Sequence, residues 1–206
     1  DMLYLPPRIA HWGTALDNCM TYSFGYRAPS ATDVLIGYTD FIAASLTEEQ
    51  RYTDTDLSPI SSPSEIRHTD IARVRALINA QLNNEQALLT WFGQFVTEAK
   101  YPEFLHGQDI NPQQLVEQLQ QGAVLTQHPS ARFAWSSIES SAQPGIVFFT
   151  SGFSRVFYGS LINLIKLLCD KDCLHIDNLQ PWLDNEDATL LLCELLKHGS
   201  MECIND

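Results

Sequence analysis

The first 27 residues constrain the fold most, because they hold three short apolar runs with no helical segment between them. The run from Met2 to Leu5 is closed by two prolines, which cannot donate to a sheet ladder. A second run, from Ile9 to Leu16, precedes Asp17-Asn18, a pair that is typical of turns. The aromatic-rich run from Cys19 to Tyr26 is typical of a third strand. The pattern predicts an antiparallel sheet or a barrel wall.

The chain starts at Asp1 rather than at a methionine, and the first apolar run follows immediately. A sheet wall needs neighbouring strands, and none can come from further upstream in this sequence. We therefore expect the chain to be the C-terminal part of a longer protein, with residues 1–28 as the last strands of a truncated barrel.

A resemblance to a known family follows from these residues. Residues 1–13 read Asp-Met-Leu-Tyr-Leu-Pro-Pro-Arg-Ile-Ala-His-Trp-Gly and resemble the closing strands of the JmjC-type cupins, which are iron(II)- and 2-oxoglutarate-dependent oxygenases. With the continuation Tyr-Ser-Phe-Gly-Tyr-Arg-Ala-Pro-Ser at 22–30, the sequence resembles the bacterial ribosomal oxygenases. Those enzymes hydroxylate an arginine of a large-subunit ribosomal protein.

The resemblance implies an α+β protein in three parts. Residues 1–28 would be closing strands of a double-stranded β-helix (JmjC/cupin) barrel. Residues 29–106 would be a helical dimerisation module that forms a homodimer, and residues 107–206 a winged-helix-like domain. It also implies Fe(II) as the cofactor, 2-oxoglutarate as the co-substrate and a ribosomal protein as the substrate, with hydroxylation at the arginine 3-position.

The resemblance also assigns candidate site residues. His11 matches the distal iron ligand of a three-ligand face that leaves positions open for the co-substrate and oxygen. Thr21 and Ser23 lie on the next run and are candidates for binding the 2-oxoglutarate carboxylate, although their face depends on the turn between the runs. Arg8 and Trp12 flank the metal position, where they would line the substrate mouth or simply pack at its rim. No residue is assigned a catalytic role.

The His-x-Asp pair that supplies the family's other iron ligands is missing from its expected place, upstream of His11. His175-Ile-Asp177 has the same spelling, but it lies far downstream in a helical or loop segment, so we interpret it as a coincidence. We expect the fragment alone not to bind iron tightly or to turn over. The alternative function is a catalytically silent, cupin-derived dimeric binding module.

Three helices are predicted after the first segment. Apolar residues recur at helical spacing over Thr32–Leu46, Asp70–Leu82 and Glu85–Ala99. The polar stretch from Thr47 to Ser64 between the first two is predicted to be an exposed connector. Three helices make a thin module, and wide apolar faces on it require burial, either against the barrel or in a homodimer. The resemblance favours the homodimer.

The last hundred residues are predicted to form a separate domain with a helix, a small sheet and further helices. Asn111-Pro112 has the sequence of a helix start. The predicted elements are a helix ending near 121, strands at 123–126, 132–138, 146–150 and 153–157, helices at 161–168, 175–182 and 187–196, and a strand at 201–204. This layout is typical of winged helices, some of which bind DNA. The 187–196 helix contains no Lys or Arg, and the domain has five basic against twelve acidic residues. We therefore predict no DNA binding and a structural or protein-binding role.

The whole chain is acidic, with a net charge of −13. Such a chain binds polyanions poorly and suits a basic partner, although acidity is also common in bacterial proteins. No run of 18 apolar residues is present, which predicts no membrane span. Five cysteines without framework spacing favour reduced thiols. Together with the resemblance, these features predict a cytoplasmic protein.

Overall fold

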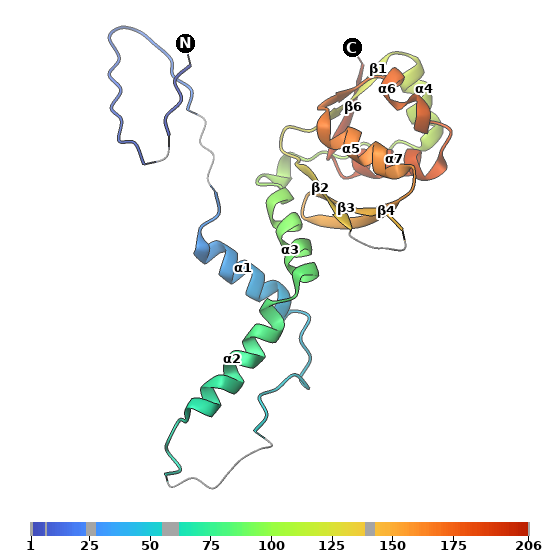
Figure 1. Ribbon diagram of the computed structural model, residues 1–206. Helices are drawn as coiled ribbons and strands as arrows, with labels where there is room; N and C mark the ends of the chain where they lie inside the picture. The colour runs from blue at the N-terminus through green and yellow to red at the C-terminus, as the bar shows by residue number, and fades with distance from the viewer. Residues whose placement is uncertain (1, 7, 24–27, 55–61, 139–142, 206) are drawn as a thin grey trace.

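The computed structural model describes residues 2–6, 8–23, 28–54, 62–138 and 143–205. Figure 1 shows three parts: a looping N-terminal segment, three helices, and a C-terminal domain of small sheets and helices at the far end of α3. Within the described residues, no helix has the length and apolar character needed to cross a lipid bilayer.

The three helices are α1 (Ala31–Ala43), α2 (His68–Leu82) and α3 (Glu85–Thr97). Ser30 caps α1 in a capping box, in which the Asp33 N–H donates to Ser30 Oγ at 3.1 Å and the Ser30 N–H donates to the Asp33 carboxylate at 2.9 Å. The Ser30 hydroxyl also donates to the Asp33 carboxylate at 2.7 Å, and this bond, together with the one from the Ser30 N–H, lowers the pKa of Asp33. All three predicted helices are confirmed, and the first ends three residues earlier than expected.

A small aromatic core joins α1 to α3. Trp91 is buried and lies between two other aromatic rings, with centroid distances of 5.5 Å to Tyr38 and 5.1 Å to Phe95. The Tyr38 hydroxyl donates to the Asn84 carbonyl at 3.3 Å, at the α2–α3 turn. Only Ile42 joins Tyr38 and Trp91 as a buried member of this cluster, so the described helices have a thin core.

The C-terminal domain contains two antiparallel three-stranded sheets, with strand orders β5-β1-β6 and β2-β3-β4 among the described residues. Leucines of α4, α5 and α7 fill the core between them, together with Phe148 and Phe157 from the second sheet. The elements are η1 (Pro102–Phe104), α4 (Pro112–Gln120), β1 (Ala123–Gln127), β2 (Phe133–Ile138), β3 (Gly145–Thr150), β4 (Phe153–Tyr158), α5 (Leu161–Asp170), β5 (Cys173–Leu174), α6 (Ile176–Leu179), η2 (Gln180–Trp182), α7 (Glu186–Lys197) and β6 (Met201–Asn205).

This order agrees closely with the sequence prediction. Asn111 caps α4 by accepting from the Gln114 N–H at 2.9 Å, with Pro112 in the first turn. The predicted 175–182 helix is instead two short pieces, α6 and η2, because Pro181 lies at the start of the second piece and has no N–H to continue the first. The two-residue β5 and the single turn η1 were not predicted.

Helix α3 also packs on the outer face of the β2-β3-β4 sheet. A Cβ atom on Gly93 would overlap the ring of Phe149, so the helix and the strand meet at glycine distance. Gln94 Nε2 donates to Ser154 Oγ at 3.0 Å beside this contact. The helix therefore belongs to the aromatic core on one side and to the sheet on the other.

The N-terminal segment differs from its prediction. Residues 2–6 and 8–23 form no strand, although the sequence predicted parts of three. An extended segment becomes a strand only when its N–H and C=O groups pair with a neighbour, and no described segment lies beside this one (Figure 1). The chain bends at 16–18, where a turn was expected. Residues 24–26 of the third run lie outside the described residues.

Candidate functional site

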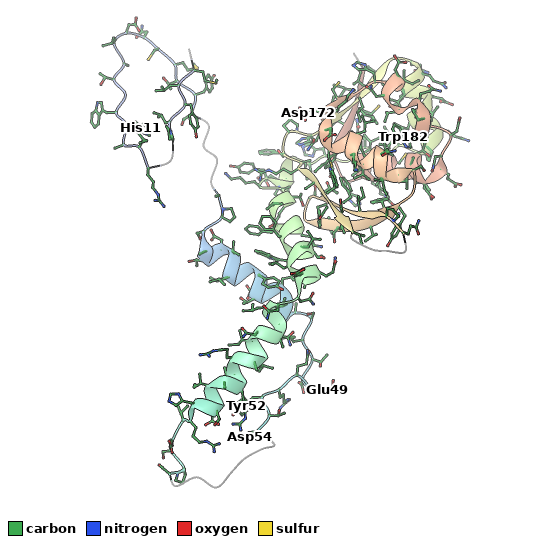
Figure 2. All side chains as sticks on the ribbon, in the orientation of Figure 1. His11, Glu49, Tyr52, Asp54, Asp172 and Trp182 are labelled. Carbon is green, nitrogen blue, oxygen red and sulfur yellow. The ribbon has the colours of Figure 1, made fainter. Side chains whose placement is uncertain are left out.

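The predicted iron ligand, His11, is exposed on the N-terminal segment, away from the helices and sheets (Figure 2). Its Nδ1 lies 3.2 Å from the carbonyl oxygen of Ile9. A carbonyl oxygen only accepts, so this contact places a proton on Nδ1, and in the neutral ring Nε2 is then the nitrogen that can bind a metal. A backbone carbonyl on one ring nitrogen is the usual way to orient a metal-binding imidazole, so this residue suits one position of a metal site.

The other predicted site residues lie on the same exposed segment. Arg8 has a positive φ of 66° at a turn in which the Ile9 N–H donates to the Pro6 carbonyl at 3.4 Å. Trp12 donates from its indole nitrogen to Thr14 Oγ1 at 3.1 Å. Thr21 and Ser23 are both exposed. Only local hydrogen bonds hold these side chains, and they do not converge on a common cavity among the described residues.

The described ranges contain no cluster of three His, Cys, Asp or Glu side chains that could hold a metal ion. His175 and Asp177 lie at the start of α6, where the His175 N–H donates to the Asn178 side chain at 3.2 Å. Cys169 is half-buried, and burial raises the pKa of its thiol to about 12, which disfavours the thiolate that binds metals.

A second candidate surface is the outer face of the helices. None of the residues of α2 is buried, and Ile71, Val74 and Ile78 form an exposed stripe at 48%, 41% and 50% of full accessibility. Leu35 and Ile36 on α1 are also exposed. Apolar stripes of this width normally pack against a partner.

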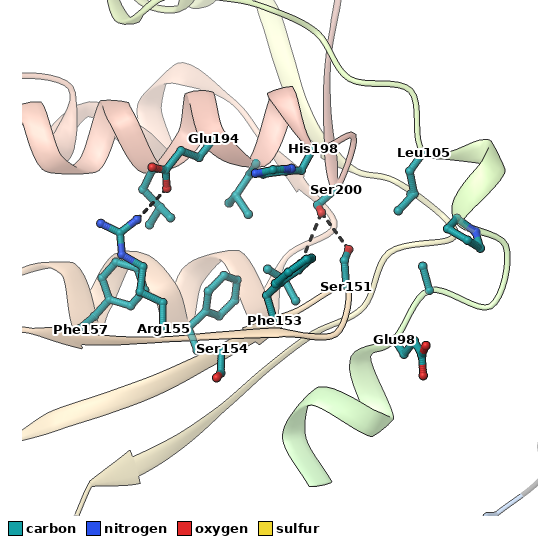
Figure 3. A pocket seen from close by; sticks show the side chains of 16 residues that line it. Glu98, Leu105, Ser151, Phe153, Ser154, Arg155, Phe157, Glu194, His198 and Ser200 are labelled. Carbon is teal, nitrogen blue, oxygen red and sulfur yellow. Dashed lines mark hydrogen bonds and ion pairs between the residues drawn. The ribbon is translucent and has the colours of Figure 1, made fainter. Parts of the chain in front are cut away.

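The third candidate is a cavity of about 550 Å³ in the C-terminal domain, between β4, α7 and the link from α3 to η1 (Figure 3). Its floor is apolar and includes Phe148, Phe157, Leu191 and Leu195. Leu105, from the link after η1, borders the opposite side.

Two contacts cross the mouth of this cavity from β4 to α7 (Figure 3). Arg155 Nη1 lies 2.7 Å from the Glu194 carboxylate, and both side chains are more than half exposed. The ring of Phe153 stacks on His198 with a centroid distance of 6.5 Å. At the hairpin end, the hydroxyls of Ser151 and Ser200 are 3.0 Å apart. The Arg155–Glu194 pair at the mouth is exposed, and an exposed ion pair contributes little stability.

Family models match both ends of the chain. The model described as a ROXA-like winged helix matches residues 80–202, and the model described as a JmjC domain matches residues 1–34. The chain thus has a winged-helix domain preceded by a segment that matches a JmjC domain model. The chain belongs to the ROXA-like winged helix family.

Curated relatives agree with the resemblance to bacterial ribosomal oxygenases, which is confirmed. The chain is 30% identical over 132 residues to the ribosomal protein uL16 3-hydroxylase of Escherichia coli (strain K12), covering 61% of the chain and 34% of that protein. It is 27% identical over 146 residues to a probable ribosomal oxygenase of Haemophilus influenzae, covering 66% and 36%. The chain spans about a third of the length of these relatives.

Solved structures share the fold. A crystal structure of the Escherichia coli ribosomal oxygenase YcfD superposes with a TM-score of 0.70 at 17% identity, over 86% of this chain and 47% of that one. A YcfD structure in complex with cobalt and 2-oxoglutarate gives a TM-score of 0.68 at 17% identity, with the same coverage.

Sequence reasoning found the N-terminal motif but missed the cavity. Its lining comes from the link that follows α3, from η1, and from β3, β4 and α7, which are far apart in the sequence. The only local signal was an aromatic alternation in β4, where Phe153 and Phe157 flank Arg155 on one face of the strand.

Proposed function

We propose that this chain is part of an iron(II)- and 2-oxoglutarate-dependent hydroxylase of a large-subunit ribosomal protein, with the 3-position of an arginine as its target. The observation that carries the proposal is the JmjC match over residues 1–34, which includes His11, in one chain with a ROXA-like winged helix. The relative named as a ribosomal protein uL16 3-hydroxylase supports the substrate class.

In this proposal His11 binds iron through Nε2 while the Ile9 carbonyl holds Nδ1. Thr21 and Ser23 bind the 2-oxoglutarate carboxylate, and Arg8 and Trp12 line the substrate mouth. Iron and 2-oxoglutarate, when bound, supply the oxygen activation, and the protein orients the target. The relative solved with cobalt and 2-oxoglutarate supports this ligand set. The family's His-x-Asp pair is missing upstream of His11 in this sequence, so we expect the 206-residue chain alone to be inactive.

The test is mass spectrometry of a uL16 peptide incubated with iron, 2-oxoglutarate and the complete protein that carries this chain. We expect the gain of one oxygen on an arginine. His11→Ala should reduce the rate by more than the roughly 10–100-fold that loss of an outer-shell partner costs. His175→Ala, at the start of α6, is the matched control and should leave the rate unchanged. An unmodified peptide with the wild-type protein would contradict the proposal.

A catalytically silent, cupin-derived dimeric binding module is the second candidate function. The exposed apolar stripe of α2 favours it, because such a surface serves association whether or not iron binds. The same assay separates the two functions: a silent module binds the ribosomal protein but leaves its mass unchanged.

We also propose that the helical module forms a homodimer through the outer faces of α1 and α2. The thin aromatic core leaves Leu35, Ile71, Val74 and Ile78 exposed, and a second copy would bury them.

A further inference from the structure

Strand β4 lies at the edge of its sheet, and its outer side has no strand partner among the described residues. In the described part of the chain β4 pairs only with β3, because the sheet order is β2-β3-β4. A two-residue turn joins the strands, with φ of 47° at Ser151 and 81° at Gly152, as in a type I′ hairpin. In such a hairpin the pair that flanks the turn, Thr150 and Phe153, exchanges both hydrogen bonds.

Successive residues of a strand direct their N–H and C=O groups to opposite sides, so this pairing determines which backbone groups of β4 point away from β3. Phe153, Arg155 and Phe157 direct their N–H and C=O groups toward β3, so the backbone groups of Ser154, Val156 and Tyr158 point outward. The last two of these residues are exposed. The outer edge of β4 is therefore a row of donors and acceptors that an extended segment can pair with.

The cavity lies directly beside this edge. Phe153, Arg155 and Phe157 line it with their side chains, and Ser154 borders it from the edge. A segment added along β4 would direct every second side chain to the cavity side of the sheet. One large apolar side chain of such a segment could then enter between Phe153, which is 70% exposed at the lip, and Leu105.

The charges around the cavity determine whether an acidic or a basic partner binds there. Glu98 lies at the C-cap of α3, where the helix dipole disfavours a carboxylate, and it makes no ion pair within the described residues. Glu194 is held only by the exposed Arg155, which an incoming cation can replace. Residues 107–206 carry five basic and twelve acidic side chains. Each of these features favours a basic partner.

We propose that the winged-helix domain binds an extended, basic protein segment along the edge of β4, with one bulky apolar side chain inserted into the cavity between β4 and α7. This binding goes beyond the proposed hydroxylation and requires neither iron nor 2-oxoglutarate. A negative hydroxylation assay would therefore not contradict this binding. Failure of the binding would likewise not contradict the proposed hydroxylation.

The test uses a fluorescent nine-residue peptide with tryptophan at its centre and threonine and arginine alternating on either side, titrated with the metal-free 206-residue chain. We expect saturable binding that weakens with salt. Replacing the central tryptophan by serine should weaken it by roughly tenfold or more. Replacing the arginines by glutamates should abolish it.

Backbone methylation of the peptide tests strand pairing without touching the protein. If the segment adds antiparallel to β4, N-methylation of the two residues that flank the tryptophan removes the N–H groups that face β4 and should abolish binding. N-methylation of the tryptophan itself removes an N–H that faces away and should be tolerated. If methylation of the flanking residues and methylation of the tryptophan change the affinity equally, the peptide does not add as a strand to β4.

Protein variants locate the site. Val156→Pro removes an outward N–H and breaks no bond to β3, so we expect binding to be lost with an unchanged fold, while Val156→Thr keeps binding. Glu98→Lys and Glu194→Lys should each weaken binding by about two- to fivefold. Glu117→Lys on α4, an exposed residue outside the cavity lining, is the matched control and should have no effect.

Three outcomes would overturn the proposal. One is the absence of saturable binding by the wild-type chain. Another is peptide-induced NMR shift changes on α1 and α2 with none at 153–158. The third is self-association that Val156→Pro removes, because a second copy of the chain would then be the occupant of the β4 edge.

Discussion

Gly93 allows helix α3 to pack closely on the β2-β3-β4 sheet. A methyl group at this position overlaps the Phe149 ring, which is itself buried. Gly93→Ala should therefore lower the free energy of unfolding by about 1–3 kcal/mol, the usual cost of overpacking, against a gain of up to about 1 kcal/mol in helix propensity.

Denaturant unfolding in a double-mutant cycle measures this effect. The penalty of Gly93→Ala should shrink when Phe149→Leu makes room for the methyl group. Gly13→Ala adds the same methyl in open space and should be neutral. A full penalty that persists beside Phe149→Leu would show that the two residues do not meet.

Residues whose contacts lie a few positions away in the sequence were predictable. Residues whose contacts are with distant segments of the chain were not. Asn111 was identified as a helix start because a cap involves only the next three residues. Gly93 gave no signal, because its close contact is with a strand more than fifty residues away. Arg155 and Glu194 pair across 39 residues, so the cavity mouth could not be predicted from local sequence either.

At the scale of elements, α2 is the helix whose environment is incomplete. Its stripe of Ile71, Val74 and Ile78 is exposed, and the homodimer proposal requires a second copy to cover it. Val74→Asp and Ile78→Asp together should convert the dimer to a monomer, because two carboxylates would be buried without partners. Sedimentation velocity across a range of concentrations measures this.

Ala76→Asp is the matched control for this prediction. Ala76 is exposed on the same helix, about 160° around its axis from Ile78 at 3.6 residues per turn. The control should stay dimeric. A wild-type chain that is monomeric at every concentration, or a control that dissociates as readily as the stripe variant, would contradict the dimer.

The helices and strands show where the spacing of apolar residues is sufficient to predict an element from the sequence. Helices α1 and α3 and strands β1 to β4 were predicted within a few residues, because each has enough apolar positions to show its period. The runs at 2–5 and 9–16 have the composition of strands but no neighbour to pair with among the described residues, so composition alone was insufficient there. The two residues of β5 are too few to show any period.

At the scale of the whole molecule, helix α3 contributes to the smaller of two unequal cores and packs on the outer face of the sheet that borders the larger one. The cluster in the C-terminal domain is large, whereas the helical cluster has only Tyr38, Ile42 and Trp91 as buried members. The general layout of helices followed by a winged-helix-like domain was predictable from the order of patterns. The packing of α3 on the sheet was not, because an amphipathic pattern tells which face is buried but not against what.

Unequal cores predict unequal local stability. In native-state hydrogen exchange at low protein concentration, amides of α1 and α2 should exchange through openings of much lower free energy than those of β3 and α7. Raising the concentration should slow exchange in α1 and α2 only, because dimerisation stabilises the state that binds the second copy. The monomeric α2 variant should lose this concentration dependence and keep the protection of α7. Equal protection of α2 and α7 at every concentration would show that the helices unfold together with the winged-helix domain as one unit.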